Sequence, residues 1–135
     1  MPKVQSVTYT PGFVQQPGNP TPQPTAILSS LDVLFIPTMF SFGIAIVVDD
    51  IKENFGFRFQ FVGTEGEVII NTPQTDIPPP KDSVMVFALS FSNVPLRYEG
   101  EHKARITLNT DTTEHPITVY HRPNGGSYKP TVRPV

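Results

Sequence analysis

The sequence predicts an all-β protein folded as an antiparallel β-sandwich of seven or eight strands, and three observations support this. Several short runs alternate apolar and polar residues with a period of two, which is typical of strands with one buried face. Clusters of Gly, Pro, Asn and Thr separate these runs, and no segment shows a convincing helical periodicity. Strands of this kind in one domain favour a sandwich, with a closed barrel as the alternative.

The composition sets limits on this fold. Of the 135 residues, 38% are hydrophobic and 16% are charged, against a usual charged fraction of ~25%. A chain of this length is expected to form one domain with one core. The sequence contains 16 prolines, more than twice the usual ~5%. Most of them fall outside the alternating runs, so they mark loops, corners and strand ends.

The expected strands follow one another along the whole chain. They cover residues 4–9, 31–35, 40–48, 55–61, 67–71, 83–91, 103–110 and 117–121. A turn at Thr64–Gly66 joins the fourth and fifth into a hairpin, and Asn109–Thr112 forms a second polar turn. Pro116 is placed at the start of the last strand, where a missing backbone donor is tolerated.

Three proline-rich or glycine-rich segments lie between or after the strands. Residues 11–25 are expected to form a long loop and residues 71–82 a crossover loop, because proline fixes φ and lacks an N–H donor. Residues 123–135 form a Pro- and Gly-containing C-terminal tail. The predicted domain organisation is therefore a single sandwich domain over residues 1–122, followed by the tail.

The most regular alternation is a stripe of phenylalanines: Phe55, Phe57, Phe59 and Phe61. Four rings on one strand face would fill a sandwich core, because each removes about 150–250 Å² from water. The alternative is an exposed aromatic face that binds nucleic acid or a small ligand by stacking. The acidic neighbourhood of the stripe and the net charge of −2 disfavour nucleic acid.

Several turn and strand landmarks occur in a familiar order. They are Phe35–Pro37 before the long apolar strand, the Glu65–Glu67 turn, and Pro95–His102 leading from a corner into a strand. In this order the chain, from Val4 to His121, resembles a family of small uncharacterised bacterial and phage-borne domains. The resemblance implies an immunoglobulin-like β-sandwich and brings no catalytic residue with it. Tyr98 resembles the corner tyrosine of such sandwiches, whose hydroxyl bonds nearby backbone.

No arrangement of residues indicates catalysis. The chain has no cysteine, which excludes disulfides, thiolate nucleophiles and zinc–thiolate sites. Ser90 and Ser92 have no histidine nearby in the sequence, and Glu99 with Glu101 is expected to be solvated. The sequence also lacks a glycine-rich phosphate loop. We therefore expect a protein that is not an enzyme, with no catalytic or cofactor-binding residues.

Metal binding is also not expected. His115 and His121 are six residues apart on one strand, which is about 20 Å and too far for a shared ion, and His102 has no assigned neighbour. The acidic segment Asp49–Glu53, with Asp76 or Glu65, is a candidate calcium loop. It does not match the spacing of an EF-hand, and Lys52 interrupts it. The simpler interpretation is a solvated polar loop.

The predicted function is a non-enzymatic interaction or structural module that acts through protein–protein contacts with a protein partner or as a homo-oligomer. A strip of Arg97, Lys103 and Arg105 is a candidate surface for an acidic partner. Neither a signal peptide nor a spanning segment is evident, so we expect a soluble cytoplasmic protein without membrane or nucleic-acid partners. A virion component would have the same features.

Overall fold

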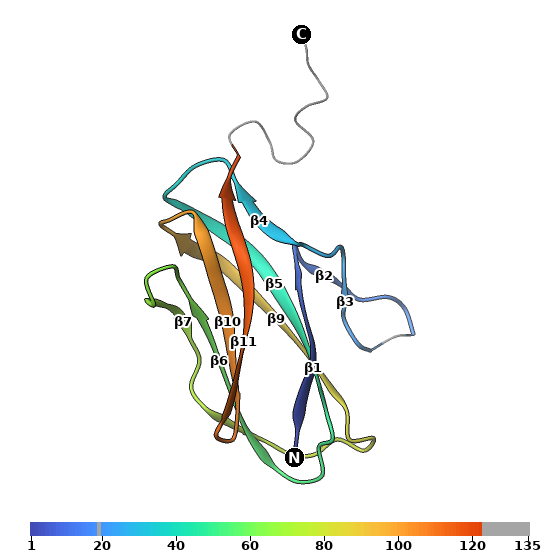
Figure 1. Cartoon of the computed structure of the whole chain (residues 1–135). Coiled ribbons are helices and arrows are strands. Elements are labelled where there is room, and N and C mark those ends of the chain that lie inside the picture. The colour runs from blue at the N-terminus through green and yellow to red at the C-terminus, as the bar shows by residue number, and fades with distance from the viewer. Residues whose placement is uncertain (19, 123–135) are drawn as a thin grey trace.

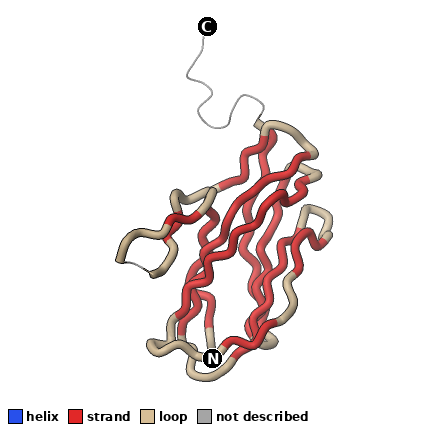
Figure 2. Tube along the Cα trace, turned by 180° about the vertical axis from the view of Figure 1, so that it is seen from behind, coloured by secondary structure: helices blue, strands red, loops and turns tan. Residues whose placement is uncertain are grey.

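In the computed structural model, which describes residues 1–18 and 20–122, the described chain is built of strands with no helix (Figures 1 and 2). This confirms the prediction of an all-β protein. Eleven strand segments are present in the described residues, of which eight have four residues or more. They are β1 (Lys3–Thr10), β2 (Phe13–Val14), β3 (Gln23–Pro24), β4 (Ser30–Val33), β5 (Thr38–Asp49), β6 (Phe55–Val62), β7 (Val68–Asn71), β8 (Thr75–Ile77), β9 (Met85–Leu96), β10 (Gly100–Leu108) and β11 (Asp111–His121).

Most of these strands belong to two sheets that face each other (Figure 1). The three-stranded sheet has the order β1-β5-β9, and both of its pairings are antiparallel. The six-stranded sheet has the order β4-β11-β10-β6-β7, and β8 pairs with a further part of β6. Figure 2 shows the same two layers from behind.

One pairing departs from the expected antiparallel arrangement. β4 runs parallel to β11, with Leu31 opposite Val119, so the six-stranded sheet is mixed. The alternation of side chains has a period of two in parallel and antiparallel strands alike. It therefore carries no information about strand direction, which is set by the course of the chain through both sheets.

The core lies between the two sheets and is rich in phenylalanine. Phe57 of β6 stacks on Phe87 of β9, with ring centroids 4.3 Å apart and planes within 4° of parallel. A second stack joins the same two strands: the rings of Phe59 and Phe91 have centroids 5.1 Å apart. These contacts place β9 directly over β6. β7 and β8 pair with the side of β6 that faces away from β10, so they form the edge of the six-stranded sheet nearest β9.

The proline-rich segment 11–25 is a loop closed by a short ribbon of β2 and β3. Figure 1 shows this ribbon standing off one side of the molecule. The Phe13 ring packs on Gly43 of β5, so closely that a Cβ at Gly43 would lie 2.6 Å from the ring. The crossover segment 71–82 also contains a strand, β8, which the sequence does not predict. The predicted tail, 123–135, lies outside the described residues.

Two prolines occupy positions that the sequence does not predict. Pro116 lies within β11, opposite Lys103, and not at the start of a strand. β4 begins to pair with β11 only at Thr118, so the other side of β11 is open at Pro116. Proline is tolerated on such an open side because no ladder donor is required there. Pro95 similarly lies inside β9, which has an open edge.

Candidate functional site

The phenylalanine stripe belongs to the core. Phe59 and Phe61 are fully buried, Phe55 is 1% exposed and Phe57 is 7% exposed. Their rings contact Phe87, Phe91 and Phe42 of the opposite sheet, among others. This confirms the interpretation of the stripe as core. Stacking of a base or small ligand on these rings would require the two sheets to separate.

The three histidines occupy separate structural positions. His102 is buried, its Nδ1 lies 3.0 Å from the Gly100 carbonyl, and its ring stacks on Phe61 with centroids 5.7 Å apart. His115 Nε2 lies 2.9 Å from the Thr113 hydroxyl, and burial lowers the pKa of His115. His121 Nε2 contacts the Leu34 carbonyl at 3.1 Å. Within the described residues, no three His, Asp or Glu side chains come together as a metal site.

The acidic segment 49–53 is a surface turn in which one side chain enters the core. Ile51 is buried, whereas Asp50 is half-exposed and has a φ of 57°. The N-terminal ammonium and Lys52 lie 3.6 Å from the Asp50 carboxylate, and they lower its pKa in that order of importance. Asp76, the proposed partner of this loop, instead accepts a hydrogen bond from Asn54 at 3.1 Å.

The corner role predicted for Tyr98 is wrong, and a different tyrosine makes the expected kind of contact. Tyr98 is 45% exposed, and its ring lines a surface pocket. Tyr9 of β1 is buried instead. Its hydroxyl donates to the His115 carbonyl at 2.6 Å and accepts from the Ala104 N–H at 3.2 Å. This hydroxyl joins the three-stranded sheet to β10 and β11, and burial raises its pKa.

The outer face of the six-stranded sheet is charged and its charges are largely paired. Lys103 and Arg105 both contact Glu114 of β11, at 3.4 and 3.1 Å. The hydrogen bonds from Arg105 and then Lys103 lower the pKa of Glu114. Arg58 of β6 donates two hydrogen bonds to the side-chain Oδ1 of Asn71. The predicted basic strip is thus divided, because Arg97 lies elsewhere, at the corner between β9 and β10.

The polar residues considered for catalysis do not come together. Ser90 and Ser92 are exposed on β9. Glu99 accepts a hydrogen bond from the backbone N–H of His121 at 2.9 Å, and Glu101 is exposed on β10.

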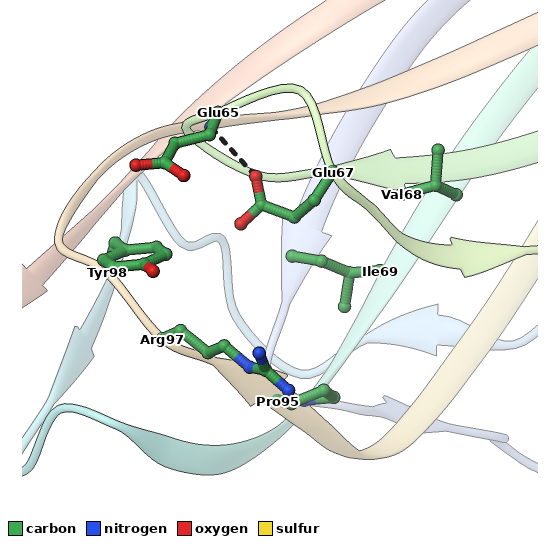
Figure 3. A pocket seen from close by; sticks show the side chains of 7 residues that line it. All are labelled: Glu65, Glu67, Val68, Ile69, Pro95, Arg97 and Tyr98. Carbon is green, nitrogen blue, oxygen red and sulfur yellow. Dashed lines mark hydrogen bonds between the residues drawn. The ribbon is translucent and has the colours of Figure 1, made fainter.

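A pocket of about 360 Å³ lies where the β6–β7 turn meets the end of β9 (Figure 3). Glu65 and Glu67 form one side, and the Glu67 carboxylate accepts a hydrogen bond from the Glu65 N–H at 2.9 Å. Arg97 and Tyr98 stand on the other side. Among the described residues Arg97 makes no ion pair. The pocket is open, mixed in polarity, and adjoins the free edge of β9.

The outer face of the three-stranded sheet carries no charged side chain in its central part. Cross-strand partners share a face, so the register identifies the outward residues. They are Ser6, Thr8, Thr10, Gly43, Ala45, Val47, Val86, Ala88 and Ser90. The β2–β3 ribbon covers the end near Gly43. The remainder displays small or apolar side chains without a charge, with Val86 41% exposed.

The edge of this sheet at β9 is also uncharged. All twelve residues from Met85 to Leu96 lack a charge, and in the described part of the chain β9 pairs only with β5. Natural proteins usually protect such edges with charges, bulges or covering loops, because unpaired N–H and C=O groups attract another strand. The uncharged outer face and the β9 edge together form the candidate site, which we call the sheet-edge surface.

Sequence reasoning did not identify this surface. Alternation located each strand, but it did not show that β1, β5 and β9 would be neighbours. The signal was nevertheless present, because residues 38–48 and 85–96 contain no Asp, Glu, Lys or Arg. The sequence has 22 charged residues in all. Two uncharged runs of this length therefore indicate that the two strands lie side by side on an uncharged surface.

Comparisons with known proteins give little further information. In the part of the chain that the structure describes, no helix is long and apolar enough to cross a membrane. No model of a protein family matches the sequence, and no curated protein matches it. One solved structure with a similar course of the chain is a β-glucosidase from Listeria innocua in complex with gluconolactone. Its TM-score is 0.47 and its identity 9%, over 89% of this chain and 16% of the β-glucosidase chain.

Proposed function

We propose that this protein is a non-enzymatic interaction or structural module that acts through protein–protein contacts at the sheet-edge surface. The observation that carries the proposal is the difference between the two outer faces. The face of the six-stranded sheet displays Arg58, Lys103, Arg105 and Glu114, whereas the central face of the three-stranded sheet displays no charge. Depletion of charge is typical of the centre of protein interfaces.

The proposal extends to the class of fold and its origin. Two facing sheets with a phenylalanine core support an immunoglobulin-like sandwich, and the order of turn landmarks supports membership of a small bacterial or phage-borne family. We place such a module in the cytoplasm or in a virion. The partner is a protein or a second copy of the chain, because the uncharged surface offers no cation to a nucleic-acid phosphate.

Matched substitutions on the two outer faces test this function. Val47→Glu and Thr8→Glu add a charge to the sheet-edge surface, and Gln60→Glu adds the same charge to the six-stranded sheet. Partners cross-linked to the protein in the cells that produce it are identified by mass spectrometry. We expect the wild type and Gln60→Glu to keep the same partners, and the other two variants to lose them.

Circular dichroism of each variant shows whether the fold is retained. Full retention of partners by folded Val47→Glu and Thr8→Glu would show that contacts are made elsewhere on the molecule. If only Gln60→Glu lost its partners, the contacts would be made by the charged face of the six-stranded sheet.

A further inference from the structure

The backbone groups at the free edge of β9 can be assigned from the neighbouring ladders. Leu28 N–H donates to the Tyr9 carbonyl at 2.8 Å, so the Tyr9 backbone groups point away from β5. Ile44, opposite Tyr9, therefore directs its groups toward β9, where its partner is Leu89. Because successive residues alternate, the N–H and C=O of Ala88 point to the free edge.

The same alternation places the backbone groups of Val86 and Ser90 at the free edge. From Met85 to Phe91 the strand has no charge, proline or bulge. The irregularity begins only beyond this run, where Asn93 has a φ of 56° and Pro95 follows. The devices that protect edge strands are therefore confined to the end of β9, and the run before them is open to pairing.

The inner side of this edge is also incompletely covered. β9 lies over β6, and it approaches β7 where Pro95 lines a pocket together with Val68 and Ile69. Ile70 of β7 and Ile77 of β8 face the same side as the core residues Phe61 and Phe55 and are only partly buried. Phe87 at the edge is likewise partly buried. One additional strand beside β9 would cover these side chains.

We propose that this strand is β9 of a second copy, paired antiparallel about a twofold axis at Ala88. The inference rests on the proposed function and specifies one partner for the same surface. Val86 then lies opposite Ser90 of the second copy, and Ala88 opposite its own equivalent. By symmetry, Ser90 lies opposite Val86 of the second copy. These three pairs, with two bonds each, give six backbone hydrogen bonds. On the inner side, Phe87 lies opposite Leu89 of the second copy.

Charge supports a second copy as the occupant. If an uncharged strand paired with a charged strand, the interface would bury an unpaired ion, which is costly. A second copy of β9 carries no charge, so it avoids this cost. Within the described residues, Asp82 before the strand and Arg97 after it have no ion-pair partner. Antiparallel pairing brings Asp82 of one copy to the strand end at which Arg97 of the other lies. The interface is isologous, as closed dimers require.

Two variants test the pairing by analytical ultracentrifugation over a concentration series. Ala88→Pro removes a donor that points to the free edge, so the β5–β9 ladder keeps its bonds. Val86→Lys adds a charge at the same edge. We expect the wild type to reach twice the 14.9 kDa of one chain, and each variant to raise the dissociation constant by at least about tenfold. Thr107→Lys, on the exposed outer face of β10, is the matched control.

A cysteine variant tests the register, since the chain has no cysteine of its own. Ala88→Cys should form a disulfide-linked dimer on mild oxidation, because the Cα atoms of a hydrogen-bonded antiparallel pair lie about 5.5 Å apart, within the range of about 4.4–6.8 Å that a disulfide spans. Thr107→Cys should form no disulfide-linked dimer. A wild type that stays monomeric throughout the series overturns the inference, and so does a dimer unaffected by folded Ala88→Pro and Val86→Lys. Val47→Glu separates this inference from the proposed function. If the wild type is a monomer and Val47→Glu loses its cross-linked partners, the proposed function stands and the self-pairing does not.

Discussion

At the scale of single residues, the contact between Tyr9 and the opposite sheet shows how a polar group is accommodated in this core. The hydroxyl satisfies the Ala104 N–H and the His115 carbonyl at once. Buried backbone groups without partners are costly, so this one side chain stabilises β10 and β11, which lie far from Tyr9 in the sequence.

The first prediction concerns this hydroxyl. Tyr9→Phe should lower the free energy of unfolding by about 1–3 kcal/mol, because it leaves the buried Ala104 and His115 groups without that partner. Urea denaturation followed by circular dichroism measures the change. Tyr98→Phe, which removes an exposed hydroxyl, should change stability by less than about 0.5 kcal/mol. Equal effects of the two substitutions would contradict the bridging role.

The second prediction concerns pH. Burial lowers the pKa of His115, so the unfolded chain binds a proton at a higher pH than the folded chain does. Stability should therefore be highest above the ordinary histidine pKa of ~6.5 and should decrease as the pH falls below it. Urea midpoints measured at several pH values test this. The decrease should be smaller in His115→Gln, and an unchanged pH profile would exclude His115 as its source.

At the scale of elements, the strand positions were largely predictable and their neighbours were not. Alternation located the strand of Phe55–Phe61 and its burial, because a period of two directly reports a one-sided core. The parallel pairing of β4, the extra strand β8 and the position of Pro116 depend on which strands meet. Tyr98 was selected from its local sequence, but a hydroxyl's partner depends on tertiary contacts, and these favoured Tyr9.

The third prediction concerns the β2–β3 ribbon. Gly43→Ala places a Cβ 2.6 Å from the Phe13 ring, so the ring must leave its place on β5. Hydrogen exchange of the Thr25 N–H, which bonds Gly12 across the ribbon, should then become at least about tenfold faster. Phe13→Ala should have the same effect. In Gly12→Ala the added Cβ meets no atom within 4 Å, so exchange should stay unchanged. Slow exchange in Gly43→Ala would show that the ribbon is stable without the contact between Phe13 and Gly43.

At the scale of the whole molecule, the outer faces of the two sheets differ in charge. The charged side chains of the six-stranded sheet are solvated and paired on its outer face, and such exposed pairs contribute little to stability. The three-stranded sheet has an uncharged central face and an open edge. The association proposed above uses the uncharged side of this asymmetric molecule.

The fourth prediction follows from this difference. Self-association through β9 buries apolar surface and backbone groups, with Asp82 and Arg97 only at the margins. Raising the ionic strength from about 0.05 M to about 0.5 M should therefore change the dimer dissociation constant by less than roughly threefold, since screening acts on exposed charges. Sedimentation measures this change. A steep dependence on salt would indicate an interface on the charged sheet.

The bond between Tyr9 and His115 also has a consequence for the synthesis of the protein. It joins residues 106 positions apart. Likewise, β4 can pair only once β11 is present, and β11 is the last strand of the described chain. The ribosome must therefore synthesise the chain through β11 before Tyr9 of β1 meets its partners in the second sheet. Folds with contacts of such long range form slowly, in milliseconds to seconds. During that interval, the emerging β9 edge is the segment that most needs protection from other nascent chains.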